Sequence, residues 1–282
     1  MATEKHKIAR LVLTQSFYDS EGEWKQKEID KAFDSFIKQN YGKKYFEFLV
    51  MSGGVIRVDY LDATYDKFSI AVLENKYTEY FFDWGNEVLA YFFSSILKKS
   101  SPKLKDIANY LTIGLDFFKP NSKEHIELVA VYDLKTDETI HWTGKFYPTE
   151  VQKRNLIKIN DLSSHFIKLN NQNIAILGCH DLMVYSPRGQ AMVTSDSWKG
   201  KVSSSFKQKC AKFKPEIVLQ HPHSTDTPNI WNLAWKTLEK ELPSVEHYAS
   251  GISYPKAYDP RGTLDKVLEK TKKGDVLDFI LM

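Results

Sequence analysis

Three reactive side chains stand at the ends of short apolar runs, where the end of a strand would present them to a common site. They are a carboxylate, Glu74, an ammonium group, Lys145, and a thiol, Cys179. Amide hydrolysis through a thioester needs a base, an oxyanion stabiliser and a nucleophile, and these three groups supply them. The order of the residues therefore predicts a hydrolase in which Cys179 attacks the substrate.

A second group of side chains suggests a different chemistry. His221 and His223, separated by one residue, are followed by Asp226, and together they could hold zinc or another divalent ion. An HxH pair is common by chance, and no second well-spaced pair of ligands accompanies it. We therefore expect no metal or other cofactor, and expect His221 and His223 to shape a substrate pocket. A metal-dependent hydrolase that uses His221, His223 and Asp226 is the alternative.

Other residues are candidates for a pocket wall or for the core. Trp142 and Tyr185 lie near the predicted nucleophile and lysine motifs, and Arg188 follows in the segment 184–202, which lacks clear periodicity. Long loops next to a site often carry specificity. Cys210 stands within a helix-like stretch without reactive neighbours, so it is expected to be a structural thiol.

Composition narrows the class of protein. The chain has 282 residues, of which 42% are hydrophobic, and its 39 basic and 36 acidic residues leave a formal charge of only +3. A chain of this size can bury a sizeable core, and the balanced charge does not favour nucleic acid. No apolar run approaches 18 residues, and the start lacks the apolar core of a signal peptide. With two cysteines and no disulfide pattern, a cytoplasmic protein that does not bind membranes is expected.

Strand and helix patterns alternate along the chain, which predicts one α/β domain over residues 1–282. Among the expected elements are a helix at 22–39, a β-hairpin formed by 46–51 and 55–60 around Gly53-Gly54, a buried strand at 68–73, helices at 86–99, 103–110 and 160–169, and a buried strand at 173–177.

Taken together, these segments resemble the nitrilase, or carbon–nitrogen hydrolase, superfamily. The resemblance runs through Ala71-Val-Leu-Glu-Asn75, the strands and turn of 126–148 that end in the lysine motif, and Ile174–Asp181 around the thiol. It departs from the family where Leu73 replaces a proline and where His180 replaces a common aromatic residue. The hairpin at 46–60 is expected to be an insertion.

The resemblance implies a four-layer α-β-β-α sandwich and a homodimer or larger homo-oligomer. It implies Glu74 as general base, Lys145 as oxyanion partner and Cys179 as nucleophile, with Glu150, His180 and Asp181 in support. The implied substrate is a small amide, with a nitrile or carbamoyl compound as variants. A non-catalytic member that binds a ligand or partner on the same scaffold is the other alternative.

Overall fold

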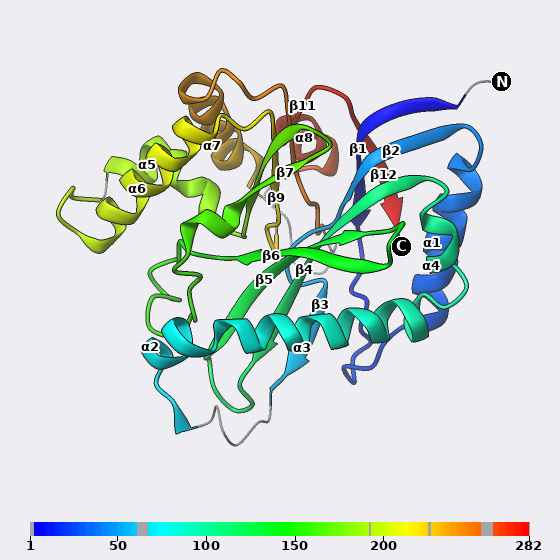
Figure 1. Ribbon diagram of the computed structural model, residues 1–282, viewed down its shortest axis with the longest axis horizontal. Helices are drawn as coiled ribbons and strands as arrows, with labels where there is room; N and C mark the ends of the chain where they lie inside the picture. The colour runs from blue at the N-terminus through cyan, green and yellow to red at the C-terminus, as the bar shows by residue number, and fades with distance from the viewer. Residues whose placement is uncertain (1–2, 61–66, 192, 225–226, 255–261, 282) are drawn as a thin grey trace.

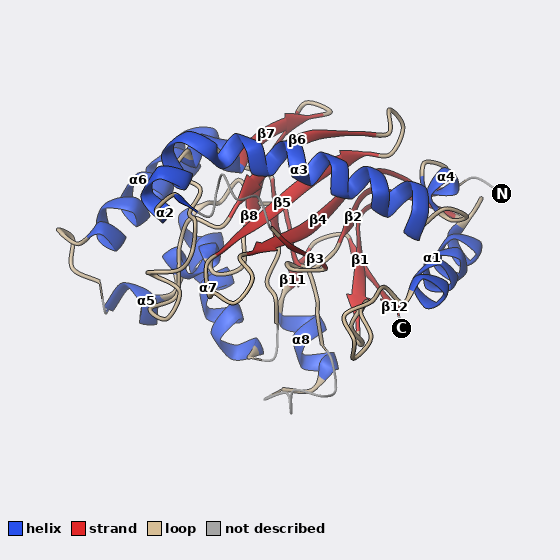
Figure 2. Cartoon of the chain, turned by 90° about the horizontal axis from the view of Figure 1, so that it is seen from below, coloured by secondary structure: helices blue, strands red, loops and turns tan. Residues whose placement is uncertain are grey.

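The computed structural model describes residues 3–60, 67–191, 193–224, 227–254 and 262–281. Two β-sheets pack face to face, and helices cover the outer face of each sheet (Figures 1 and 2). None of the helices in these ranges is long and apolar enough to span a membrane.

The larger sheet contains the first strands of the chain. Its order is β12-β1-β2-β4-β5-β6, with β3 paired to β4. Strands β12, β1, β2 and β4 pair in parallel, and β3 is also parallel to β4, whereas β4, β5 and β6 form an antiparallel meander. The strands are β1 (Glu4–Leu13), β2 (Lys44–Val50), β3 (Ile56–Asp59), β4 (Ala108–Phe118), β5 (His125–Asp133), β6 (Glu138–Gly144) and β12 (Val276–Leu281).

The smaller sheet has the order β11-β10-β9-β8-β7. The central strands β8, β9 and β10 are parallel, and β7 and β11 close the edges in the antiparallel sense. The strands are β7 (Phe166–Leu169), β8 (Gln172–Leu177), β9 (Ile217–Gln220), β10 (His247–Ser250) and β11 (Lys272–Lys273). Parallel strands that are buried on both faces read as continuous apolar runs, which is why 173–177 could be recognised as a strand.

Successive side chains of a strand point to opposite faces of the sheet, so each sheet has one face toward the other sheet and one face toward the helices. Between the sheets, Ile8, Phe48 and Val129 of the larger sheet pack against Ile174 and Leu219 of the smaller one. The opposite face of the larger sheet meets helices α1 and α3, and that of the smaller sheet meets α6 and α7. The fold is therefore α/β with the predicted order of layers, helices, sheet, sheet and helices.

Eight α-helices are described within these ranges. They are α1 (Gln26–Asn40), α2 (Ile70–Val72), α3 (Thr78–Tyr91), α4 (Ser101–Leu104), α5 (Pro187–Ala191), α6 (Trp198–Phe213), α7 (Pro228–Glu241) and α8 (Leu264–Lys270). Helix α7 begins with Pro228 in its first turn, where a proline loses no helical hydrogen bond.

The predicted hairpin at 46–60 is wrong. Both strands exist, but β2 pairs in parallel with β1 and β4, and β3 continues in parallel along β4. Gly53 and Gly54 therefore lie in a connection between two strands that run in the same direction beside β4, and they do not form a reverse turn. A Cβ at Gly54 would lie 2.5 Å from the His223 ring, so this glycine allows the chain to pass close to that side chain.

The predicted strand at 68–73 is also wrong. This run forms α2 and the start of a π-helical turn, Leu73–Tyr77, which lead directly into α3. The buried residues Leu73, Phe81 and Leu89 recur at helical spacing and face the larger sheet. A short apolar run does not by itself distinguish a strand from the apolar face of a helix.

Two further predicted helices fail. Residues 160–169 form a short 3₁₀ helix, Leu162–His165, followed by β7, and the predicted helix 103–110 ends at Leu104 before β4 begins. The helix predicted at 86–99 corresponds to the second half of α3 and the π-helical turn Phe92–Ile96.

Candidate active site

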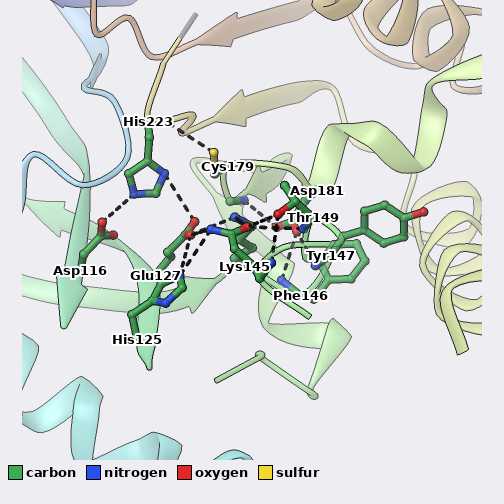
Figure 3. A network of polar contacts seen from close by, with 12 residues as sticks. Asp116, His125, Glu127, Lys145, Phe146, Tyr147, Thr149, Cys179, Asp181 and His223 are labelled. Carbon is green, nitrogen blue, oxygen red and sulfur yellow. Dashed lines mark hydrogen bonds and ion pairs between the residues drawn. The ribbon is translucent and has the colours of Figure 1, made fainter. Parts of the chain in front are cut away.

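A pocket of about 770 Å³ opens where the ends of β4, β5, β6, β8 and β9 approach one another. Its polar lining includes Asp116, Glu127, Lys145, Cys179 and His223. Figure 3 shows these side chains converging from separate parts of the chain. Phe118, Ile230 and Trp231 add apolar walls. The volume is in the range of small-molecule sites.

Lys145 lies fully buried beneath the pocket, directly after β6. Its Nζ donates hydrogen bonds to Glu127 Oε1 at 2.9 Å and to Gln152 Oε1 at 2.6 Å. Burial by itself lowers the pKa of Lys145, but the neighbouring Cys179 and Glu127 outweigh it and hold that pKa above its ordinary value. Lys145 is therefore a fixed positive charge at neutral pH.

Glu127 is the carboxylate that replaces Glu74 beside Lys145. It lies in β5 and is almost fully buried, and its Oε1 also accepts a hydrogen bond from Gln152 Nε2 at 2.8 Å. Burial favours the neutral acid, but His223 and Lys145 outweigh it and hold the pKa of Glu127 well below its usual range. Glu127 Oε2 is buried and has no hydrogen-bond partner.

His223 bridges two acids that face each other on neighbouring strands. Asp116 of β4 and Glu127 of β5 are directly opposite in the antiparallel register, an arrangement that places like charges together. His223 Nε2 lies 2.6 Å from Asp116 Oδ2, and its Nδ1 lies 3.5 Å from Glu127 Oε2 (Figure 3). Although burial lowers the pKa of His223, the two acids and Cys179 raise it well above its ordinary value, so the imidazolium offsets the repulsion.

Cys179 follows β8 at a sharp turn and is 7% exposed. Its Sγ accepts a hydrogen bond from the backbone N–H of His223 at 3.4 Å. Ligating atoms of Cys179, Glu127 and His223 all lie within 4.8 Å of one another. The thiol is therefore beside a carboxylate, a buried ammonium group and an imidazolium.

Asp181 ties the turn that carries Cys179 to the segment that follows Lys145. Its carboxylate accepts backbone N–H hydrogen bonds from Phe146 at 3.1 Å, from Tyr147 at 2.9 Å and from Gly178 at 2.7 Å. Complete burial raises the pKa of Asp181 to about 7, against the effect of these three donors. Asp181 therefore connects the two strand ends, while its supporting role in catalysis stays a prediction.

Glu74 is not brought together with Lys145 and Cys179. It lies in the π-helical turn that precedes α3, forms an ion pair with Lys158 Nζ at 2.6 Å and accepts the backbone N–H of Lys158 at 3.0 Å. Its assignment as general base followed from placing 68–73 in a strand. In a helix the same residue links α2 to the loop after β6, and Glu127 takes the position beside the lysine.

Glu150 does not hold the site together either. Its side chain is 73% exposed and pairs with Lys199 Nζ at 2.6 Å. The residue that binds Lys145 from this segment is Gln152, two positions later. Because Gln152 bonds both Lys145 and Glu127, it performs the bridging role that was expected of Glu150.

Three expected pocket residues lie elsewhere. Trp142 stacks on Phe82 of α3 and donates to Asn86, so it faces the outer helical layer. Tyr185 is buried in the core between the smaller sheet and its helices, and Arg188 is exposed on α5. None of the three is among the pocket-lining residues.

Of the remaining candidates, His180 and His223 line the pocket and His221 does not. His180 packs against Trp231, and burial together with the charge of Lys145 lowers its pKa to about 4. His221 is buried, with Nδ1 2.7 Å from the carbonyl oxygen of Met51, and burial lowers its pKa to about 4. His221 and His223 thus face different surroundings, and Asp226 lies outside the described residues.

Asp116, His125, Glu127 and Gln152 were missed by the sequence analysis. Asp116 and Glu127 each stand inside a strongly apolar strand segment, between Leu115 and Phe117 and between Ile126 and Leu128. Burying a carboxylate in such a run costs free energy unless the carboxylate has a partner. This signal could have drawn attention to Asp116 and Glu127. His125 and Gln152 carry no comparable signal, and they are found only by their contacts with Glu127.

No protein-family model and no curated protein matches the chain. Among solved structures, it is similar to an amidase of the nitrilase superfamily from Nesterenkonia sp. AN1, with 11% identity and a TM-score of 0.44 over 88% of this chain and 76% of that one. In another structure of the amidase from this source, at 11% identity and a TM-score of 0.44 over 87% of this chain and 77% of that one, acrylamide has added to the active-site cysteine.

The chain is also similar to glutamine-dependent NAD+ synthetase from Acinetobacter baumannii, with 12% identity and a TM-score of 0.42 over 86% of this chain and 38% of that one. With TM-scores below 0.5, these similarities assign neither an activity nor a substrate, and both are inferred below from the geometry of the site.

Proposed function

We propose that this protein hydrolyses a non-peptide carbon–nitrogen bond of a small amide through a thioester on Cys179. The observation that carries the proposal is the convergence of Cys179, Lys145 and Glu127 at one pocket. A buried lysine and a buried carboxylate beside a thiol are costly to maintain unless they act on something that enters the pocket.

Cys179 is the proposed nucleophile. The backbone N–H of His223 donates to its sulfur at 3.4 Å, and the charged side chains of Glu127 and His223 each offer an atom within 4.8 Å of it. Its place after a buried strand, on a turn fixed by Asp181, holds the sulfur at the pocket wall.

Glu127 is the proposed base. Its Oε2 lacks a hydrogen-bond partner, and Glu127 offers an oxygen within 4.8 Å of Cys179 Sγ. As the Cys179 sulfur bonds to the amide carbon, Glu127 takes the thiol proton. Because the neighbouring cations favour the Glu127 carboxylate, we expect this transfer to be concerted with attack. The protonated Glu127 then gives its proton to the departing ammonia or amine, and afterwards takes a proton from the water that hydrolyses the thioester.

Lys145 is proposed to stabilise the oxyanion, together with the backbone N–H of His180. Lys145 is held in place by Glu127 and Gln152, so no reorganisation is needed when charge develops on the substrate oxygen. Removal of one such donor typically lowers kcat by about 10²–10³. Lys145→Met is therefore expected to lower turnover by this amount.

The proposal is tested with the thiol itself. Purified protein is incubated with a panel of small amides, and release of ammonia or amine is measured together with the acyl mass on each cysteine. Cys179→Ala is expected to lose turnover and the acyl adduct. Cys210→Ala is the matched control, because Cys210 is a buried thiol whose pKa burial raises to about 12. Turnover that survives in Cys179→Ala contradicts the mechanism.

The same experiment separates the alternatives. A protein that binds the amides without turnover would be a non-catalytic binding protein on this scaffold. A metal-dependent hydrolase based on His221, His223 and Asp226 is not favoured, since His221 bonds to the carbonyl of Met51 away from the pocket. The cytoplasmic location and the homodimer or larger assembly stay predictions, as do nitrile or carbamoyl substrates.

A further inference from the structure

We infer that Cys179, Glu127 and His223 form a binding site for Zn²⁺, and that zinc bound there blocks the nucleophile reversibly. The inhibitory part of this inference rests on the proposed function, whereas the binding part rests on the geometry alone. The three side chains come from the turn after β8, from β5 and from the loop after β9, and they meet at the pocket wall.

The ligand atoms are close enough for one ion. Atoms of the three residues lie within 4.8 Å of one another. Zinc bonds of about 2.0–2.3 Å in a tetrahedral site separate ligand atoms by roughly 3.5 Å. His223 Nδ1 and Glu127 Oε2 already have this separation, at 3.5 Å, so the ligands must approach one another by at most about 1 Å. His223 lies in the loop after β9 and its side chain is 26% exposed, which leaves it room to move.

One ligand oxygen is in need of a partner. Glu127 Oε2 is buried without a hydrogen bond, while Oε1 of the same carboxylate is occupied by Lys145 and Gln152. The nearest cation to Oε2 is His223 Nδ1 at 3.5 Å, and a metal ion at Oε2 would give this oxygen a closer partner without breaking the bonds at Oε1.

His223 is oriented as a metal ligand. Its Nε2 lies 2.6 Å from Asp116 Oδ2, so Nε2 carries the hydrogen that this carboxylate accepts. Nδ1 faces Glu127 and, once deprotonated, presents its lone pair there. A carboxylate that holds the distal nitrogen of a histidine is a common second partner at zinc sites, where it fixes the tautomer and the ring.

The donor set and the local charge both favour zinc. Thiolate, imidazole and carboxylate together suit zinc, whereas magnesium and calcium prefer oxygen ligands alone. When zinc replaces the proton of His223, its charge balances the Cys179 thiolate and the Glu127 carboxylate, and Lys145 balances Asp116. Because three side chains leave a tetrahedral zinc ion one ligand short, water or a substrate group would complete the coordination.

Binding is measured with Co²⁺ as a spectroscopic probe for zinc, on the metal-free full chain. We expect one Co²⁺ per chain and a thiolate-to-cobalt charge-transfer band that excess Zn²⁺ removes. The band is expected to disappear in Cys179→Ser and to remain in Cys210→Ser. His223→Gln is expected to weaken binding at least tenfold, and Asp116→Asn by about 10–100-fold, the usual effect of losing a second partner.

The proposed zinc site is contradicted if the charge-transfer band is absent, or if it persists in Cys179→Ser. Thiol labelling then tests the block: zinc is expected to slow iodoacetamide modification of Cys179 at least tenfold, and a chelator is expected to restore it. These readouts need no turnover. A chain that binds zinc but hydrolyses no amide contradicts the proposed hydrolase alone, and an active chain that is indifferent to zinc contradicts the zinc site alone.

Discussion

Asp181 offers the sharpest test of how the site is assembled. Its carboxylate accepts three backbone N–H groups, two from the segment after Lys145 and one from Gly178, directly before the nucleophile. The backbones of Gly178 and Lys145 are so close that a Cβ on Gly178 would lie 2.8 Å from Lys145 Cα. Asp181 is therefore expected to control the spacing between Lys145 and Cys179.

The magnitude follows from the number of donors left without an acceptor. A buried donor that loses its acceptor costs about 1–3 kcal/mol, so Asp181→Ala, with three orphaned donors, is expected to cost roughly 3–9 kcal/mol. That is comparable to the whole stability of a typical domain and risks unfolding the chain. Asp181→Asn is the more informative change. Its remaining oxygen can keep the bonds to Phe146 and Tyr147, while its NH₂ group faces the N–H of Gly178, at a cost of about 1–3 kcal/mol.

The assay is urea denaturation of wild type and Asp181→Asn, paired with the iodoacetamide labelling rate of Cys179 in the native protein. The matched control is Asp161→Asn. Asp161 also accepts a backbone N–H, from Ser163 at 2.8 Å, but it is exposed at the start of a short helix. Because Asn and Asp serve almost equally there, a change within about 0.5 kcal/mol is expected. If Asp181→Asn is as stable as the control and labels Cys179 at the wild-type rate, Asp181 does not hold the site together.

Three further outcomes are expected. Gly54→Ala should lower the free energy of unfolding in urea by more than about 2 kcal/mol, since φ is +57° and the new Cβ would lie 2.5 Å from the His223 ring. The control Gly42→Ala, at φ +67° with nothing within 4 Å, should cost only about 1–2 kcal/mol. Equal losses in the two variants would argue against the contact with His223. Glu74→Gln should lower stability by about 1–3 kcal/mol and leave turnover unchanged, and a tenfold loss of turnover would restore Glu74 as base. His165 is fully buried, which lowers its pKa to about 4, so its contribution to stability is present above pH 6.5 and is lost as pH falls toward 4. Because burial also lowers the pKa values of His180 and His221 to about 4, the free energy of unfolding in urea should fall over this range by more than the roughly 3 kcal/mol due to His165. His165→Gln should reduce the fall by about that share, and an unchanged fall would contradict the role of His165.

The sequence by itself determined the elements whose signals are local. The continuous apolar run before Cys179 predicted a buried strand, and β8 occupies it. Lys145 follows a strand in the same way, and the strand and turn before it predicted the antiparallel pair of β5 and β6. These two reactive residues could be recognised because the pattern that buries a strand is written in consecutive residues.

Only the tertiary structure decided which carboxylate meets them. The run 68–73 fits a strand or one face of a helix equally well, and packing of Leu73, Phe81 and Leu89 against the larger sheet selects the helix and removes Glu74 from the site. Pairing between β4 and β5 places Asp116 opposite Glu127, and the loop after β9 brings His223 between them. Strand register and the packing of the sheets depend on contacts between distant residues, and a local pattern does not specify such contacts.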